Sequence, residues 1–127
     1  MDQRHRPKLL FVEDEFLIRL TVAEALSDDG FEVLEAASGE EALQLLGADP
    51  SVALLLTDLQ LPGKIDGGEL VRRARETRPD LPVILVTGRP EQRASAAASP
   101  RDMVIVKPYL PSEVSAAVRR MLGLPPA

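Results

Sequence analysis

Short apolar runs recur along the chain, and longer polar segments separate them. The runs cover residues 8–12, 32–36, 52–57, 83–86 and 104–106. The third run is apolar up to its last residue, which is typical of a strand buried on both faces of a parallel sheet. The pattern therefore predicts five strands, with connecting segments long enough to return the chain to the same end of a sheet.

The connecting segments carry apolar residues at the three- and four-residue spacing of an amphipathic helix. In the first of them, Leu17, Leu20, Val22 or Ala23, and Leu26 stand roughly at this spacing. We predict five helices, at residues 16–28, 38–46, 66–78, 90–99 and 112–122.

Three helix ends carry recognisable signals. Ser38 with Glu41, and Asp66 with Glu69, form the capping pattern in which an N-cap oxygen and an acidic side chain bind free amides. Gly30 stands where a helix C-terminal glycine belongs. These signals place two helix starts and one helix end.

Strict alternation of five strands and five helices predicts a doubly wound α/β domain with a flavodoxin-like parallel sheet. Right-handed crossovers then place helices on both faces of the sheet. The alternation runs from residue 8 to residue 122, so residues 1–7 and 123–127 are predicted to be short tails. A chain of 127 residues has the length of one such domain.

Composition narrows the range of functions. Apolar residues make up 45% of the chain, which is enough for a core, whereas aromatic residues make up 3% and the net charge is −5. The last two values argue against direct nucleic-acid binding. The absence of cysteine excludes disulfides, thiolate catalysis and sulfur-ligated zinc. The first apolar run is too short for a signal peptide or a membrane span, so we expect a cytoplasmic protein without a membrane anchor.

Polar residues follow the apolar runs where the predicted strands end. Glu13 and Asp14 follow the first run, Asp58 the third, Thr87 the fourth and Lys107 the fifth. In an open parallel sheet, ligands bind outside the carboxyl ends of the strands. We therefore expect these five side chains to meet at one edge of the sheet.

Three of these residues are acidic, and like charges a few Å apart repel one another. A Mg²⁺ ion would relieve the repulsion, because it prefers oxygen ligands and keeps several waters. We expect Asp14 and Asp58 as direct ligands with a nearby backbone carbonyl, and Glu13 acting through water. In the alternative interpretation, Glu13 and Asp14 only begin a helix, where acidic side chains meet the positive end of the dipole.

Lys107 and Thr87 favour phosphate chemistry at Asp58. The strand and Pro108 hold the lysine stem, while Thr87 and Gly88 offer a hydroxyl and an unobstructed backbone N–H. An acid, a metal, an ammonium and a hydroxyl around one carboxylate predict phosphoryl transfer to that carboxylate by positioning and charge neutralisation. The Lys107–Pro108 bond is also a candidate cis peptide.

Six short motifs occur in a specific order. They are Val12-Glu13-Asp14-Glu15, Leu55-Leu56-Thr57-Asp58, Leu61-Pro62-Gly63, Asp66-Gly67, Val86-Thr87-Gly88 and Val106-Lys107-Pro108-Tyr109. With this order and spacing, residues 8–122 resemble the receiver domain of two-component response regulators, here as a stand-alone, single-domain type.

The resemblance implies that Asp58 accepts a phosphoryl group from a histidine kinase or histidine phosphotransfer protein, which switches binding of a downstream protein target. It also implies a Mg²⁺ site and two phosphoryl contacts. The metal residues are Glu13, Asp14, Asp58 and the carbonyl of Gln60, and the contacts are Thr87 and Lys107. Such a signalling module catalyses its own phosphorylation and dephosphorylation and is not otherwise an enzyme. We expect a monomer or weak dimer.

The chain departs from the usual receiver pattern in four places. Residues 62–67 carry one additional residue, and the stretch from Thr87 to Lys107 is shorter than usual. Val104 stands where many receivers carry a switching Tyr or Phe, and Tyr109 stands where Phe is more common. We expect the phosphorylation chemistry to be unaffected and the switch to use residues 88–99 instead of a turning ring.

Three other functions fit less of the pattern. A Mg²⁺-dependent phosphohydrolase with an aspartyl nucleophile typically carries a second acid two residues later, where Gln60 stands. A flavodoxin-like nucleotide module would have a Gly- or Ser/Thr-rich loop after the first strand, where acidic residues repel phosphate. The intact set of Asp58, Thr87 and Lys107 argues against a degenerate receiver that acts only as a scaffold.

Overall fold

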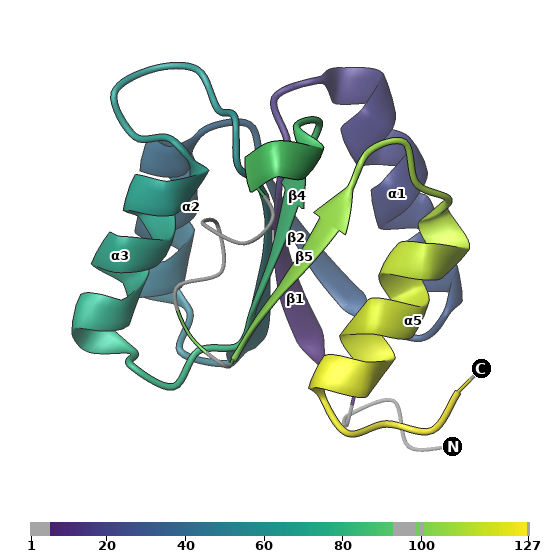
Figure 1. Cartoon of the computed structure of the whole chain (residues 1–127). Helices are drawn as coiled ribbons and strands as arrows, with labels where there is room; N and C mark the ends of the chain where they lie inside the picture. Colours follow the sequence, from purple (N-terminus) through teal and green to yellow (C-terminus); the bar gives the residue numbers. More distant parts are fainter. Residues whose placement is uncertain (1–5, 93–98, 100, 127) are drawn as a thin grey trace.

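The computed structural model describes residues 6–92, 99 and 101–126. Strands and helices alternate along the chain, as predicted (Figure 1). The elements are β1 (Lys8–Val12), α1 (Phe16–Asp28), β2 (Glu32–Ala36), α2 (Gly39–Ala48), β3 (Val52–Asp58), α3 (Gly67–Thr77), β4 (Val83–Thr87), the 3₁₀-helix η2 (Pro90–Gln92), β5 (Asp102–Val106) and α5 (Pro111–Met121).

The five strands form one parallel sheet in the order β2-β1-β3-β4-β5. The chain moves from β1 outward to β2 and then returns to the other side of β1, so the order reverses between β1 and β3. The strands are in register at the carboxyl edge, where the partners are Val12 with Thr57, Asp58 with Val86, and Thr87 with Val106. Ligands of open α/β sheets bind at such a switch point.

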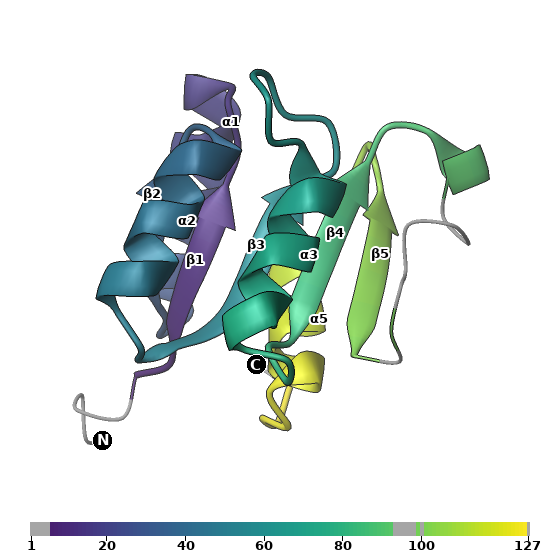
Figure 2. The same ribbon diagram turned by 90° about the vertical axis from the view of Figure 1, so that its left-hand side faces the viewer.

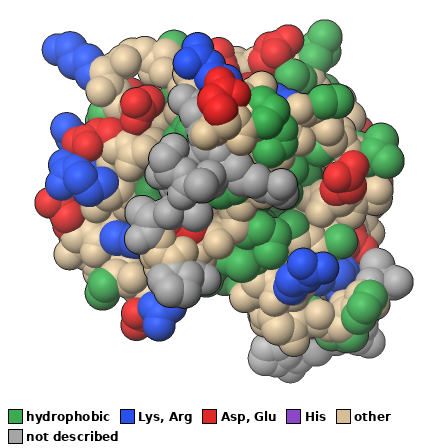
Figure 3. All heavy atoms as spheres, in the orientation of Figure 1, with side chains coloured by type: hydrophobic (Ala, Val, Ile, Leu, Met, Phe, Trp, Pro, Cys, Tyr) green, Lys and Arg blue, Asp and Glu red, His purple; other side chains and the backbone are tan. Residues whose placement is uncertain are grey.

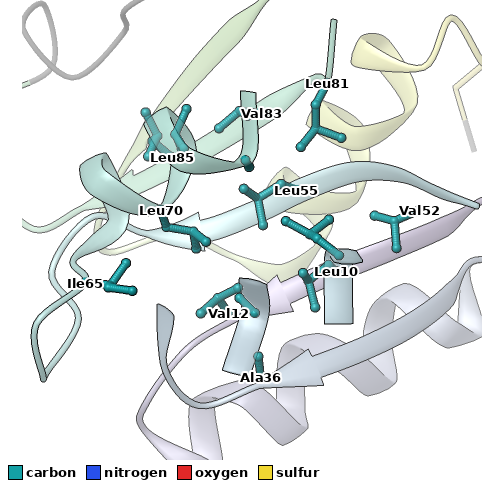
Figure 4. Close-up of a cluster of buried hydrophobic side chains, with 14 of the residues drawn as sticks. Leu10, Val12, Ala36, Val52, Leu55, Ile65, Leu70, Leu81, Val83 and Leu85 are labelled. Atoms are coloured by element: carbon teal, nitrogen blue, oxygen red, sulfur yellow. The ribbon is translucent and has the colours of Figure 1, made fainter. Parts of the chain in front are cut away.

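Helices cover both faces of the sheet. Helices α1 and α5 lie on one face, and α2 and α3 lie on the other (Figures 1 and 2). Alternate residues of β1 supply the two cores. Leu9 and Phe11 lie on the α1–α5 side, and Leu10 and Val12 lie in the cluster on the α2–α3 side that Figure 4 shows. Each fully buried leucine of this kind contributes about 1.5–3 kcal/mol to stability. The continuous apolar strands are thus explained by burial on two faces.

The predicted helix-end signals form hydrogen bonds. The side chains of Ser38 and Asp66 accept hydrogen bonds from the backbone N–H groups three residues later, those of Glu41 and Glu69. Gly30 has φ +100°, and its N–H and the next one return to carbonyls in the last turn of α1. Glycine suits this left-handed position because it has no Cβ. The N-caps and the helix-end glycine are therefore confirmed. The reciprocal acidic bond is found in part, because the Glu41 carboxylate accepts from the Ala37 N–H, whereas the Glu69 carboxylate accepts from Arg72 and Arg73.

Several boundaries differ from the prediction. Helix α2 continues two residues beyond residue 46, and β5 begins two residues before residue 104. Of the helix predicted at residues 90–99, the described part is the 3₁₀-helix η2, and most of the remainder lies outside the described residues. The described part of the chain therefore has four α-helices where the sequence predicts five. None of these helices is long and apolar enough to cross a bilayer.

Candidate phosphoryl-acceptor site

The carboxyl edge of the sheet brings together residues that end or follow four strands. Glu13 and Asp14 follow β1, Asp58 is the last residue of β3, Thr87 ends β4, and Lys107 follows β5. The parallel register aligns these ends, so residues far apart in the sequence lie above the switch point between β1 and β3. The five residues lie at one edge of the sheet as predicted, and contacts between side chains are found for Glu13, Asp14, Asp58 and Lys107.

Asp58 is 5% exposed, and both of its carboxylate oxygens are held. Its Oδ2 accepts a hydrogen bond of 2.8 Å from Lys107 Nζ, and its Oδ1 accepts one of 3.1 Å from the backbone N–H of Gln60. The backbone of β3 is fixed in turn, because the Thr57 hydroxyl donates to the Asp58 carbonyl oxygen. Asp58 therefore presents an oriented carboxylate in a protected position.

Lys107 is positioned by the backbone on both sides. Its N–H donates to the Thr87 carbonyl at 2.8 Å, and the Lys107–Pro108 peptide bond is cis. Burial disfavours the charged ammonium, but the hydrogen bond and charge of Asp58 and the charge of Glu13 outweigh it and raise the pKa of Lys107. Lys107 is therefore a firmly charged ammonium group beside the acceptor carboxylate.

Glu13, Asp14 and Asp58 form an acidic cluster in which one carboxylate oxygen of each lies within 4.8 Å of the others. Glu13 is 3% exposed, and burial raises its pKa from 4.5 to about 7, with the charge of Asp58 and a hydrogen bond to Asp14 acting in the same direction. The backbone N–H of Glu15 and the charge of Lys107 oppose this rise. A buried acid among acids is stabilised in its charged form by a cation.

The donor set suits Mg²⁺. All donors are oxygens, and Mg²⁺ needs only one or two carboxylates because it retains waters. Gln60 lies beside the cluster, because its backbone N–H donates to Asp58 Oδ1. That its carbonyl oxygen binds the metal stays a prediction.

Thr87 is fully buried at the end of β4. Its hydroxyl oxygen accepts a hydrogen bond of 3.1 Å from the backbone N–H of Arg89, so the loop after β4 is anchored on this side chain. The neighbouring residue Val86 pairs with Asp58 across the sheet. Thr87 is thus linked to the site by the sheet backbone, and its predicted contact with a phosphoryl group stays a prediction.

Sequence reasoning gave no role to two residues that shape the site, Arg19, which it did not name, and Gly67, which it named only within a motif. Arg19 donates from Nη1 to the carbonyl oxygen of Glu13 at 2.8 Å. Gly67 lies so close to β3 that a Cβ there would be 2.3 Å from the Asp58 carbonyl oxygen. A signal for Arg19 exists, because a basic residue in the first turns of a helix opposes the helix dipole and needs another reason to be there.

An apolar recess of about 590 Å³ adjoins the site. Helix α1 contributes Leu17, Ile18, Thr21 and Val22 to its lining, and the residues after β4 and β5 contribute Gly88, Lys107, Pro108, Tyr109 and Pro111. Leu17 and Leu20, which helical spacing groups with the buried Val22 and Leu26, are exposed instead. The reason is helix geometry: at 3.6 residues per turn the buried face of α1 runs through Ile18, Val22 and Leu26, and Leu17 and Leu20 lie on the side turned away from it.

Comparison with known proteins gives a consistent result. The family model described as the response regulator receiver domain matches residues 9–119. The transcriptional regulatory protein ResD of Bacillus subtilis is 36% identical over 124 residues, which are 96% of this chain and 50% of ResD. The chain thus spans about half the length of this relative.

Solved structures share the fold. A response regulator receiver protein from Sinorhizobium medicae superposes with a TM-score of 0.85 and 25% identity, covering 94% of this chain and 97% of that one. The response regulator protein TrrA from Thermotoga maritima, solved in complex with Mg²⁺-BeF, gives a TM-score of 0.78 and 29% identity, covering 91% and 98%.

Proposed function

Because the chain belongs to the family of response regulator receiver domains, we propose that it accepts a phosphoryl group on Asp58 in a two-component phosphorelay. The observation that carries the proposal is the geometry of Asp58, a buried carboxylate 2.8 Å from Lys107 Nζ beside two further acids. The donor is a histidine kinase or histidine phosphotransfer protein. The domain is a signalling module that catalyses its own phosphorylation and dephosphorylation.

The chemistry follows from the residues around Asp58. A carboxylate oxygen attacks the phosphorus of a phosphohistidine, the new O–P bond forms as the P–N bond breaks, and the imidazole nitrogen leaves with the electron pair and takes up a proton. Lys107 neutralises negative charge on the phosphoryl oxygens, and the Thr87 hydroxyl donates to one of them. Such transfer needs positioning and electrostatic stabilisation more than acid–base catalysis.

We further propose that the acidic cluster holds Mg²⁺. Asp14 and Asp58 would be direct ligands, and Glu13 would act through water. The all-oxygen donor set and the cost of burying Glu13 among acids support this assignment, as does the Mg²⁺-BeF complex of TrrA. When bound, the ion supplies positive charge for the carboxylates and the phosphoryl oxygens.

The phosphodonor protein must contact the surface around Asp58, which is charged at the acidic cluster and Lys107 and apolar on the side toward α1 and the start of α5. Among the described residues, the exposed large hydrophobic side chains are Phe16, Leu17 and Leu20 on α1 and Leu110 before α5. Figure 3 shows hydrophobic side chains on the half of the molecule that carries these two helices. An apolar helical surface of the donor would cover them while its phosphohistidine reaches Asp58. A cytoplasmic location, a monomeric or weakly dimeric state and a downstream protein target stay predictions.

Phosphorylation by a small-molecule donor tests the proposal. The chain is incubated with acetyl phosphate and Mg²⁺ and its intact mass is measured. We expect the mass of one phosphoryl group on the wild type and none on Asp58→Asn. A gain that survives this substitution, or an acid-stable phosphate on serine or threonine, would contradict the proposal, and no gain in the wild type would favour a scaffold.

A further inference from the structure

We propose that Arg19 is a positioning residue, which holds the turn between β1 and α1 so that the acidic cluster is preorganised for its cation. This inference rests on the proposed function in taking the cluster of Glu13, Asp14 and Asp58 as a Mg²⁺ site. Arg19 lies on α1 and is not one of the site residues predicted from the sequence.

The guanidinium of Arg19 makes three different contacts. Nη1 donates to the Glu13 carbonyl oxygen at 2.8 Å, Nε lies 3.3 Å from Glu35 Oε1 on β2, and the group stacks 5.5 Å from the centroid of the Phe16 ring. The side chain is only 15% exposed. Because Arg19 is held between a helix residue and a strand residue, it is a rigid hydrogen-bond donor to the turn.

The Glu13 backbone is fixed from both directions. Its N–H donates to the carbonyl of Ala36 on β2 at 3.0 Å, and its carbonyl accepts from Arg19. Its carboxylate accepts a hydrogen bond from the Glu15 N–H at 2.9 Å, which closes the turn over Asp14. Since a peptide bond is planar, holding the Glu13 carbonyl also fixes the plane that leads into Asp14.

This matters for metal binding because Mg²⁺ demands near-ideal ligand geometry. Asp14 is exposed and stands in a turn between secondary-structure elements, so the orientation of its carboxylate depends on the peptide plane before it. Groups that orient metal ligands from outside the coordination shell typically change affinity by about 10–100-fold when they are removed. Arg19 is in the position to have such an effect.

A purely structural role for Arg19 would be a partly exposed ion pair with Glu35, and such pairs contribute about 0–1 kcal/mol. That role explains neither the donation to Glu13 nor the choice of a cation in the first turns of a helix, where the dipole favours acids. Both observations are explained if the Arg19 side chain holds the backbone of the turn that carries Glu13 and Asp14.

The chain offers a matched control in Arg119 on α5. Its guanidinium also stacks on a phenylalanine, 5.4 Å from the Phe31 ring, pairs with a carboxylate, that of Asp29 at 2.9 Å, and donates to a backbone carbonyl. The side chain is 19% exposed. Arg119 differs from Arg19 in one relevant respect, because its partners lie at the end of α1 remote from the acidic cluster.

The experiment is a calorimetric titration of the full chain with Mg²⁺ alone, beside urea unfolding, for the wild type and three variants. We expect Arg19→Ala to weaken Mg²⁺ binding by about tenfold or more. Arg19→Lys keeps the charge but can reach only one of the two acceptors, the Glu13 carbonyl oxygen or Glu35 Oε1. The Mg²⁺ affinity of this variant should therefore lie between those of the wild type and Arg19→Ala. Arg119→Ala should lower stability and leave the affinity within about twofold of wild type, as distant sites do.

Three outcomes would overturn the inference. Equal affinity of wild type and Arg19→Ala would show that the turn does not need this arginine. Equal weakening by Arg119→Ala would show that the effect follows stability alone. If Arg19→Ala does not fold, Glu35→Gln replaces it, and unchanged affinity in that variant would be the contrary result. Absence of Mg²⁺ binding by the wild type would instead refute the metal site of the proposed function.

Discussion

Replacing Gly67 with alanine should damage both stability and phosphorylation. Gly67 opens α3, and its N–H donates to the Leu59 carbonyl at 3.0 Å. A Cβ at Gly67 would lie 2.3 Å from the Asp58 carbonyl oxygen and 2.7 Å from Leu59 Cα. Both are backbone atoms, so the start of the helix or the end of β3 would have to move by about 1 Å to reach ordinary contact distances.

The magnitude can be estimated against the adjacent glycine. Overpacking of this kind costs about 1–3 kcal/mol. A Cβ at Gly68 would meet only the Asp66 side chain at 3.6 Å and the Leu59 side chain at 4.0 Å, which are ordinary contacts. Gly68→Ala should therefore be neutral or stabilise the fold by about 0.4–1 kcal/mol, through reduced freedom of the unfolded chain. The two variants should differ by about 1–4 kcal/mol.

Urea unfolding and phosphorylation by acetyl phosphate measure the two effects. With a denaturant slope of about 1–3 kcal/mol/M, the urea midpoints of the two variants should lie about 0.3–4 M apart, with that of Gly67→Ala the lower. Phosphorylation of Gly67→Ala should slow by about tenfold or more, since a displacement of about 1 Å at a reacting group can cost 100-fold. Equal midpoints and equal rates for the two variants would refute the reasoning that the close approach of α3 positions Asp58.

Three further predictions concern the metal, the phosphoryl lifetime and pH. Mg²⁺ at 100 times its dissociation constant should stabilise the wild type by about 2.7 kcal/mol, and Asp14→Ala should abolish the Mg²⁺ dependence of the melting temperature; an equal response would place the cation elsewhere. Replacing Gln60 and Arg89 together by alanine should change the dephosphorylation rate by several-fold, measured by decay of the phosphorylated mass, and an unchanged decay would show that neither reaches the site. The hydrogen bond from Lys8 lowers the pKa of Asp49 from 3.8 to about 2, so its stabilising effect is full above pH about 4 and lost as pH falls through about 2; Asp49→Asn should remove this part of the acid sensitivity in unfolding experiments, and an identical acid limb would contradict it.

Local sequence was sufficient wherever the interactions are local. The N-caps at Ser38 and Asp66 and the glycine after α1 each satisfy backbone groups within a few residues, so short motifs predict them. The gathering of Asp58, Thr87 and Lys107 was also predictable, although they are distant in sequence. In a parallel sheet the carboxyl ends of all strands lie at one edge. The residues that end the strands can therefore be grouped without knowing their individual contacts.

The sequence by itself determined the alternation of elements, the parallel sheet and the edge at which the polar residues meet, because hydrophobic period and strand ends encode them. Only the tertiary structure decided which neighbours complete the site. Arg19 reaches Glu13 because α1 crosses back beside β2, and Gly67 is needed because α3 begins against the end of β3. These features depend on how closely the backbones of separate elements approach one another. The pattern of residues along a single segment carries no information on that distance.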